Sequence, residues 1–81
     1  PYPGMYTFFK GRRVKIYKTL PLNGQIKNPG QIMESSKNSL TISTGNNLLK
    51  VLEIQIEGKK RMSYVEFVNG TDIKPGDMFK K

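Results

Sequence analysis

The 81-residue sequence contains no cysteine and no histidine. Without cysteine it has neither a thiolate nucleophile nor a disulfide, and without histidine it lacks the side chain that titrates near neutral pH unaided. The usual ligands of zinc are absent for the same reason. Most catalytic constellations are therefore excluded, and a binding role is the first expectation.

Acidic residues are also few, and none forms an obvious acid and base pair. Glu66 is better explained as a helix cap, Asp72 and Asp77 fall in turn-like surroundings, and Glu53 lies on a strand where a solvated charge is ordinary. The sequence has no nucleophile beside a base and no glycine-rich phosphate loop. We expect no catalytic residue, metal ligand or cofactor site in this chain.

No apolar run approaches the roughly 18 residues that span a bilayer. Residues 1–13 carry their charges after the apolar stretch, the reverse of a secretory signal. Because the absence of cysteine is compatible with a reducing compartment, we expect a soluble, cytoplasmic protein. The sequence begins with Pro1 rather than methionine, so we hypothesise that it is a fragment of a longer polypeptide.

Positive charge is in large excess, with 14 Lys and Arg against 6 Asp and Glu, a net charge of +8 and a pI near 9.9. Such an excess favours phosphate-bearing partners through counterion release and electrostatic steering. The composition, 36% hydrophobic, indicates a compact domain rather than a disordered tail. We expect residues 1–81 to form a single domain with a thin core.

The first third of the sequence predicts two strands joined by a turn at Gly11. Residues 1–4 contain two prolines and predict an extended lead-in, and residues 5–9 predict a first strand or packed arm. Residues 12–18 alternate with the period of a half-buried strand. One face carries Val14 and Ile16, and the other, basic face carries Arg13, Lys15 and Tyr17.

The middle of the sequence predicts a loop followed by three strands. Turn-forming residues are too dense over residues 20–29 for a regular element. Residues 31–34 predict a short strand, and residues 40–44, rich in β-branched side chains, predict another. The longest apolar segment, residues 48–56, predicts a central strand that is covered on both sides for part of its length.

A capping box predicts one short helix near the end of the chain. Ser63 as the N-cap accepts from the backbone of Glu66, the Glu66 side chain reaches back, and Met62 faces Phe67 as a hydrophobic staple. Residues 69–70 supply the stop. Such a short helix is stable only when packed on the sheet, so we expect its apolar edge to plug a barrel.

Short strands at roughly ten-residue spacing, with one small helix, predict a compact barrel. We predict a mainly β fold, a five-stranded and partly open barrel of the oligonucleotide-binding (OB) type, with an SH3-like barrel as the alternative. Residues 75–76 predict a turn, and residues 78–79 complete a last strand or contact the core. The aromatic residues expected in the core are Phe8, Phe67 and Phe79.

Two basic clusters are candidates for phosphate contact, one around the alternating strand and one directly before the capped helix. The N–H groups and dipole of a helix N-terminus also attract anions. A solvated face that only keeps the domain soluble is the alternative explanation. Tyr17, between Lys15 and Lys18 on the outward register, is the ring we expect to stack on a base. The predicted nucleic-acid-binding residues are Lys10, Arg12, Arg13, Lys15, Tyr17, Lys18, Lys59, Lys60 and Arg61.

The order of several short motifs resembles the C-terminal domain of methionyl-tRNA formyltransferases. The resemblance covers nearly the whole chain, and the run of residues 52–62 with Phe67 and Gly70 is its most specific part. The motifs are PYPG followed by Tyr6-Thr7, GRRVKI, Pro29-Gly30-Gln31-Ile32, LLKVLEIQ, GKKRM and an F-x-x-G.

This resemblance implies an OB-like barrel appended to a catalytic formyl-transfer domain. In that family the barrel helps to hold the initiator methionyl-tRNA on a positively charged surface while the methionyl amine is formylated. The 10-formyltetrahydrofolate site and the catalytic Asn, His and Asp belong to the family's N-terminal domain. By likeness, the tRNA-facing surface includes Lys10, Arg12, Arg13, Lys59, Lys60 and Arg61.

Two other interpretations stay open. Tyr6 stands where tryptophan is common in the family, and PYPG followed by an aromatic also occurs in sugar-nucleotide N-formyltransferases, which share the barrel without acting on tRNA. A purely structural or dimer-contact module is the third interpretation. We therefore predict a non-catalytic accessory domain of a formyltransferase that binds initiator methionyl-tRNA, with these two alternatives.

Overall fold

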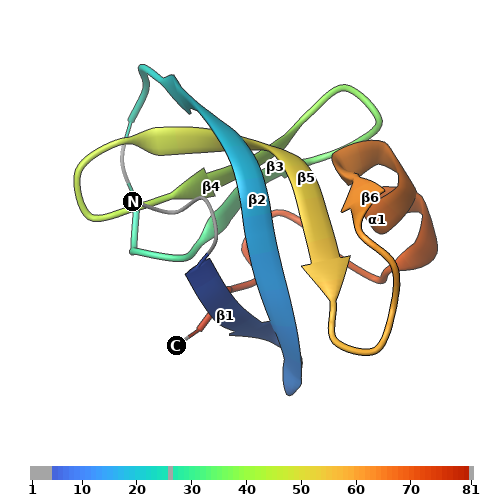
Figure 1. Cartoon of the computed structure of the whole chain (residues 1–81). Helices are drawn as coiled ribbons and strands as arrows, with labels where there is room; N and C mark the ends of the chain where they lie inside the picture. Colours follow the sequence, from blue (N-terminus) through green and yellow to red (C-terminus); the bar gives the residue numbers. More distant parts are fainter. Residues whose placement is uncertain (1–4, 26, 81) are drawn as a thin grey trace.

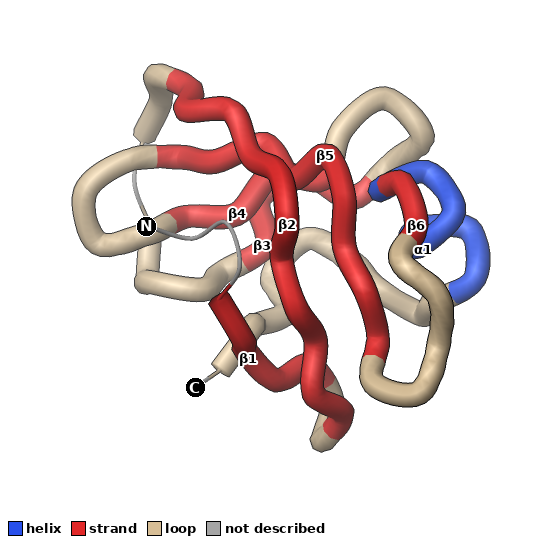
Figure 2. The backbone as a smooth tube through the Cα atoms, in the orientation of Figure 1, coloured by secondary structure: helices blue, strands red, loops and turns tan. Residues whose placement is uncertain are grey.

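One curved antiparallel sheet and one short helix make up the computed structural model, which describes residues 5–25 and 27–80 (Figures 1 and 2). The strand order is β1-β2-β5-β4-β3, and β6 pairs with β5. The predicted lead-in, residues 1–4, lies outside the described residues. The elements are β1 (Met5–Phe9), β2 (Arg12–Leu22), β3 (Ile32–Ser35), β4 (Leu40–Ser43), β5 (Leu48–Ile56), β6 (Met62–Ser63) and α1 (Tyr64–Gly70).

The β2 and β5 pair forms the middle of the sheet, where the two long strands run side by side (Figure 1). Register shifts on both sides of Lys18 mark bulges, which bend a strand and increase its twist. Two long strands that bend in this way can form part of both halves of a barrel, because each continues from one half into the other. The structure is the predicted mainly β, small OB-like barrel, and the predicted central strand over residues 48–56 is confirmed as β5.

The predicted loop over residues 20–29 is wrong at its start, because β2 continues to Leu22. Residues 20–22 pair with residues 48–50 of β5. Pro21 is tolerated there because, among the described residues, β1 pairs only with residues 12–16, so the far end of β2 has no second neighbour in that part of the chain. A proline on such an edge leaves no ladder hydrogen bond unmade.

A closing segment, residues 76–80, lies between the two outer strands of the sheet. Lys80 bridges to Phe8 of β1, and Met78 bridges to Gln31 beside β3. The Phe79 N–H donates to the Gly30 carbonyl at 2.8 Å, and the Lys80 N–H donates to the Phe8 carbonyl at 2.8 Å. The segment therefore closes the barrel, which confirms that residues 78–79 complete the sheet.

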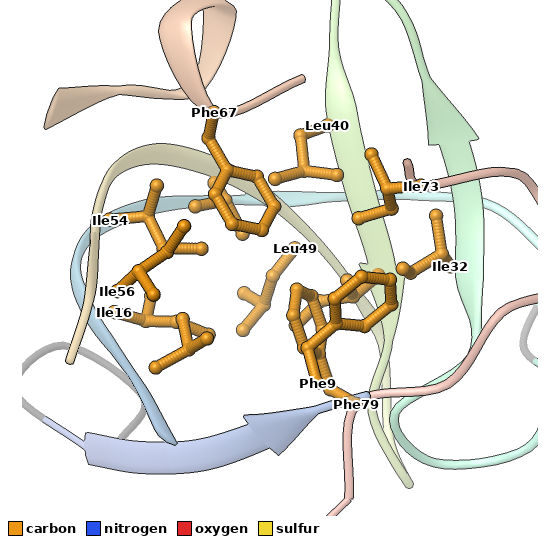
Figure 3. Close-up of a cluster of buried hydrophobic side chains, with 13 residues drawn as sticks. Phe9, Ile16, Ile32, Leu40, Leu49, Ile54, Ile56, Phe67, Ile73 and Phe79 are labelled. Atoms are coloured by element: carbon orange, nitrogen blue, oxygen red, sulfur yellow. The ribbon is translucent and has the colours of Figure 1, made fainter. Parts of the chain in front are cut away.

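The core fills the space enclosed by this closed sheet (Figure 3). The Phe9 ring meets the Phe79 ring edge-on at 5.4 Å and the Phe67 ring at 6.4 Å, so β1, α1 and the closing segment share one aromatic contact. Phe67 and Phe79 are buried as predicted. Phe8 is not, with 43% of its surface exposed, because strand alternation turns Phe9 inward and Phe8 outward.

Helix α1 begins and ends where the sequence predicts. Ser63 Oγ accepts from the Glu66 N–H at 3.4 Å, and the Glu66 carboxylate lies 3.5 Å from the same hydroxyl. Phe67, 1% exposed, fixes the helix on the barrel, while Met62 packs against the same core. Within the described residues, no helix has the length and apolar character needed to cross a membrane.

We expect Gly30→Ala to destabilise the barrel more than Gly58→Ala. Both glycines have a left-handed φ, +86° and +83°, so each alanine costs about 1–2 kcal/mol of backbone strain. A Cβ at Gly30 would also collide with the Phe79 carbonyl, whereas the space at Gly58 is open. This overpacking adds roughly 1–3 kcal/mol. Urea unfolding measures both free energies, and equal losses would contradict the role of the closing contact.

Candidate nucleic-acid interface

Cations and tyrosine rings alternate along the outer face of β1 and β2. Tyr6 is paired with Lys15 across the two strands. The Arg13 guanidinium lies 4.7 Å from the centre of the Tyr6 ring, and the Lys15 ammonium lies 5.3 Å from it. Lys15 is also 5.0 Å from the Tyr17 ring. We call this surface the aromatic strip, formed by Arg13, Tyr6, Lys15, Tyr17 and Arg61.

Tyr17 is held in place by two cations that contact its ring and by a hydrogen bond from its hydroxyl. The Arg61 guanidinium carbon is 4.0 Å from the ring centre, a closer contact than that of Lys15. The Tyr17 hydroxyl donates to Gln55 Oε1 at 2.6 Å, and Gln55 Nε2 donates to the Lys59 carbonyl at 2.8 Å. The ring predicted to stack is therefore contacted by Lys15, its neighbour along β2, and by Arg61, which is distant in the chain.

Glu53 organises the cations at this end of the strip. Its carboxylate lies 3.2 Å from Lys18 Nζ and 2.6 Å from Arg61 Nε. The hydrogen bond from Lys18, with further help from the bond and charge of Arg61, outweighs partial desolvation and lowers the pKa of Glu53. Arg61 reaches it because β6 pairs Ser63 with Glu53. Glu53 thus holds two predicted phosphate-binding cations in fixed positions.

A second group of cations, the helix-end cluster of Lys10, Arg12 and Lys59, lines a hollow of about 240 Å³ beside the C-terminal end of α1. Lys10 Nζ donates to the Asp72 carbonyl at 2.6 Å and lies 3.5 Å from the Asp72 carboxylate. The last turn of α1 carries no basic residue of its own. Cations at this end oppose the negative end of the helix dipole, so the cluster has a structural explanation.

Eight of the nine predicted binding residues therefore divide between two places, and the structure does not gather them on one surface. Arg13, Lys15, Tyr17, Lys18 and Arg61 belong to or border the aromatic strip. Lys10, Arg12 and Lys59 form the helix-end cluster, and Lys60, which is exposed, belongs to neither group. The tight turn at Gly58 splits residues 59–61, which the sequence placed together before the helix.

Two exposed aromatic residues were missed as candidates. Tyr6 is 51% exposed and Phe8 is 43% exposed, and residues two apart on a strand share a face. Phe8 is paired with Arg13, and Tyr6 with Lys15, so both rings lie on the side of the aromatic strip. The signal was present in the sequence, because alternation counted back from a buried Phe9 turns both rings outward.

Comparison with known proteins shows which family this chain resembles. The model of the family described as formyl transferase, C-terminal domain, matches residues 1–72. A methionyl-tRNA formyltransferase of Streptococcus uberis is 41% identical over 98% of this chain, which covers 26% of that relative. Relatives of the same name from Carboxydothermus hydrogenoformans and Dictyoglomus turgidum are 40% and 39% identical over 99% of the chain. The chain spans about a quarter of the length of these relatives.

The ion pairs of Glu53 predict a pH dependence of stability. Because its pKa is lower in the folded chain, Glu53 stabilises the fold fully above the ordinary glutamate pKa of about 4.3. The contribution is lost as the pH falls through the lower, folded value. We expect the free energy of unfolding of wild type to exceed that of Glu53→Gln near pH 6, and we expect the difference to shrink as the pH falls below the ordinary glutamate pKa of about 4.3.

Urea unfolding at a series of pH values measures this difference. Glu34→Gln is the matched control, since Glu34 is exposed and forms no ion pair in the described part of the chain. A difference between wild type and Glu53→Gln that does not change with pH would contradict the stabilising role of the carboxylate.

Proposed function

The chain belongs to the formyl transferase C-terminal domain family, and we propose that it serves a methionyl-tRNA formyltransferase as the domain that holds the initiator methionyl-tRNA. The observation that carries the proposal is the concentration of cations and rings on the outer face of β1 and β2. The names of the relatives favour tRNA over a sugar nucleotide as the partner. In this role the domain acts in the cytoplasm, where aminoacyl-tRNA is used.

Electrostatics supports an anionic polymer as the partner. The net charge of +8 is carried by a body with a radius of gyration of only 11.2 Å. Within the described residues, Lys15 has no acidic partner, and Lys18 and Arg61 share the single carboxylate of Glu53. Such a surface attracts phosphates and releases their counterions on binding.

Formyl transfer itself we assign to the remainder of the enzyme, together with 10-formyltetrahydrofolate. The residues of this chain do not fit that cofactor's reaction. The hollow beside α1 is lined by three cations and a single carboxylate, that of Asp72, which already pairs with Lys10. It therefore offers no free general base. In this role the chain contributes binding, and the chemical step takes place elsewhere in the enzyme.

Titration of the full chain with initiator methionyl-tRNA at two salt concentrations tests this function. If roughly four phosphates are contacted, the Kd should rise about a hundredfold between about 50 and 200 mM salt. Fluorescence anisotropy of labelled tRNA measures the change. Absence of binding at the lower salt concentration would contradict the proposal and favour a structural module.

A further inference from the structure

We propose that the aromatic strip, extended by Phe8, is the RNA-contacting face and that it takes unpaired nucleotides rather than a duplex. The helix-end cluster has a structural role and contributes little to RNA affinity. This inference rests on the proposed RNA-binding function, which it deepens by naming the surface and the class of RNA structure that the surface fits.

The exposure of two rings on the strip needs an explanation. Phe9, Phe67 and Phe79 are each no more than 5% exposed, so the core takes aromatic side chains readily. Tyr6 and Phe8 are left outside at 51% and 43% exposure. Covering the half of each ring that remains exposed would stabilise a complex by on the order of 1 kcal/mol per ring. The two neighbouring rings are therefore accessible to a ligand that stacks on aromatic side chains.

The chemistry of the strip fits unpaired bases. Every free base has a π face that stacks on aromatic rings and guanidinium planes, and cations between the rings contact the phosphates. In a duplex the base faces are stacked internally, so a protein surface meets mainly phosphates and sugars. The cations of the strip would serve either form of RNA, but the rings serve only the unpaired one.

The spacing of the rings matches a stacked single strand. Tyr6 and Tyr17 occupy diagonal positions on β1 and β2, about 7–8 Å apart. Phe8 follows Tyr6 by two residues along β1, about 7 Å further. Since successive bases rise by about 3.4 Å, each interval equals roughly two base steps. The strip has room for on the order of four nucleotides.

Internal contacts prepare both ends of the strip for binding. Glu53 holds Arg61 against Tyr17, Gln55 fixes the Tyr17 hydroxyl, and Glu57 lies 3.5 Å from Arg13. Side chains that are already ordered lose less entropy when a ligand binds. The Gln55 amide is engaged through both its oxygen and its nitrogen. The strip therefore stacks bases without reading their edges, and we expect little sequence preference.

Lys10 of the helix-end cluster is already engaged by acidic residues. Lys10 Nζ bonds to Asp72 and also lies 4.0 Å from the Asp77 carboxylate. Lys10 itself has a left-handed φ of 51° in the β1–β2 turn, an uncommon conformation for a lysine, and these bonds compensate for its strain. Arg12 and Lys59 line the same hollow at the negative end of α1.

The test of stacking uses a labelled single-stranded RNA of about ten nucleotides and the same RNA annealed to its complement. Tyr6→Ala should weaken binding of the single strand about fivefold to a hundredfold and binding of the duplex by less than about twofold. Tyr6→Phe keeps the ring and should bind like wild type. Leu20→Ala removes an equally exposed apolar side chain of β2 and is the matched control.

A second comparison separates the two groups of cations at equal charge. Arg13→Gln/Lys15→Gln removes two positive charges from the strip, and Arg12→Gln/Lys59→Gln removes two from the helix-end cluster. We expect the first pair to weaken single-strand binding about tenfold or more and the second by less than about threefold. Thermal unfolding checks that all variants are folded.

The outcomes distinguish this inference from the function on which it rests. If wild type binds RNA but Tyr6→Ala binds both forms like wild type, or both double variants lose equally, the strip is not the contact surface and RNA binding still stands. If wild type binds the duplex as tightly as the single strand, selectivity for unpaired nucleotides is wrong. If wild type binds no RNA at low salt, the proposed function fails, and this inference fails with it.

Discussion

Backbone hydrogen bonds from the closing segment reach both outer strands of the sheet, and the other elements depend on this closure. Residues 79 and 80 bond to Gly30 on one side and to Phe8 on the other. The same bonds bring the Phe79 ring against Phe9, which in turn meets Phe67 of α1. Without the segment, β1 would be held only by β2, and two strand edges would be left unpaired. A thin core of this size cannot easily compensate for that loss.

Closure also fixes which side chains face outward on β1. A slip of one residue between β1 and β2 would turn Phe9 into water and Tyr6 and Phe8 into the barrel. The buried aromatic contact of Phe9 opposes that slip, so the core determines the composition of the outer face. The exposed rings and the buried ring are therefore consequences of one register, and the proposed binding surface cannot be separated from the packing beneath it.

Features that depend on a few consecutive residues were predictable from the sequence. The alternation of Val14 and Ile16, the apolar length of β5 and the Ser63 cap all follow from local patterns. The predictions that were wrong concern residues whose position depends on contacts with parts of the chain that are distant in sequence. Pro21 joins β2 because residues 48–50 lie beside it, and Phe8 faces outward because Phe9 takes the place in the core against Phe67 and Phe79. The sequence predicted the candidate cations but not their division, because Glu53 and α1 draw them to different places.

That division shows why net charge alone does not define a binding site. Acidic residues placed among cations weaken the attraction for phosphate, yet Glu53 and Glu57 both lie beside cations of the strip. Their benefit is geometric, because a guanidinium already held against a ring loses less entropy when a ligand binds, whereas an unrestrained guanidinium must be ordered at that moment. Any of the 14 basic residues can attract a phosphate-bearing ligand at long range. Stacking on bases also needs planar side chains that are held in position, which requires aromatic rings, guanidinium groups and a carboxylate in contact with one another. In the described residues that combination lies on the outer face of β1, β2 and β5.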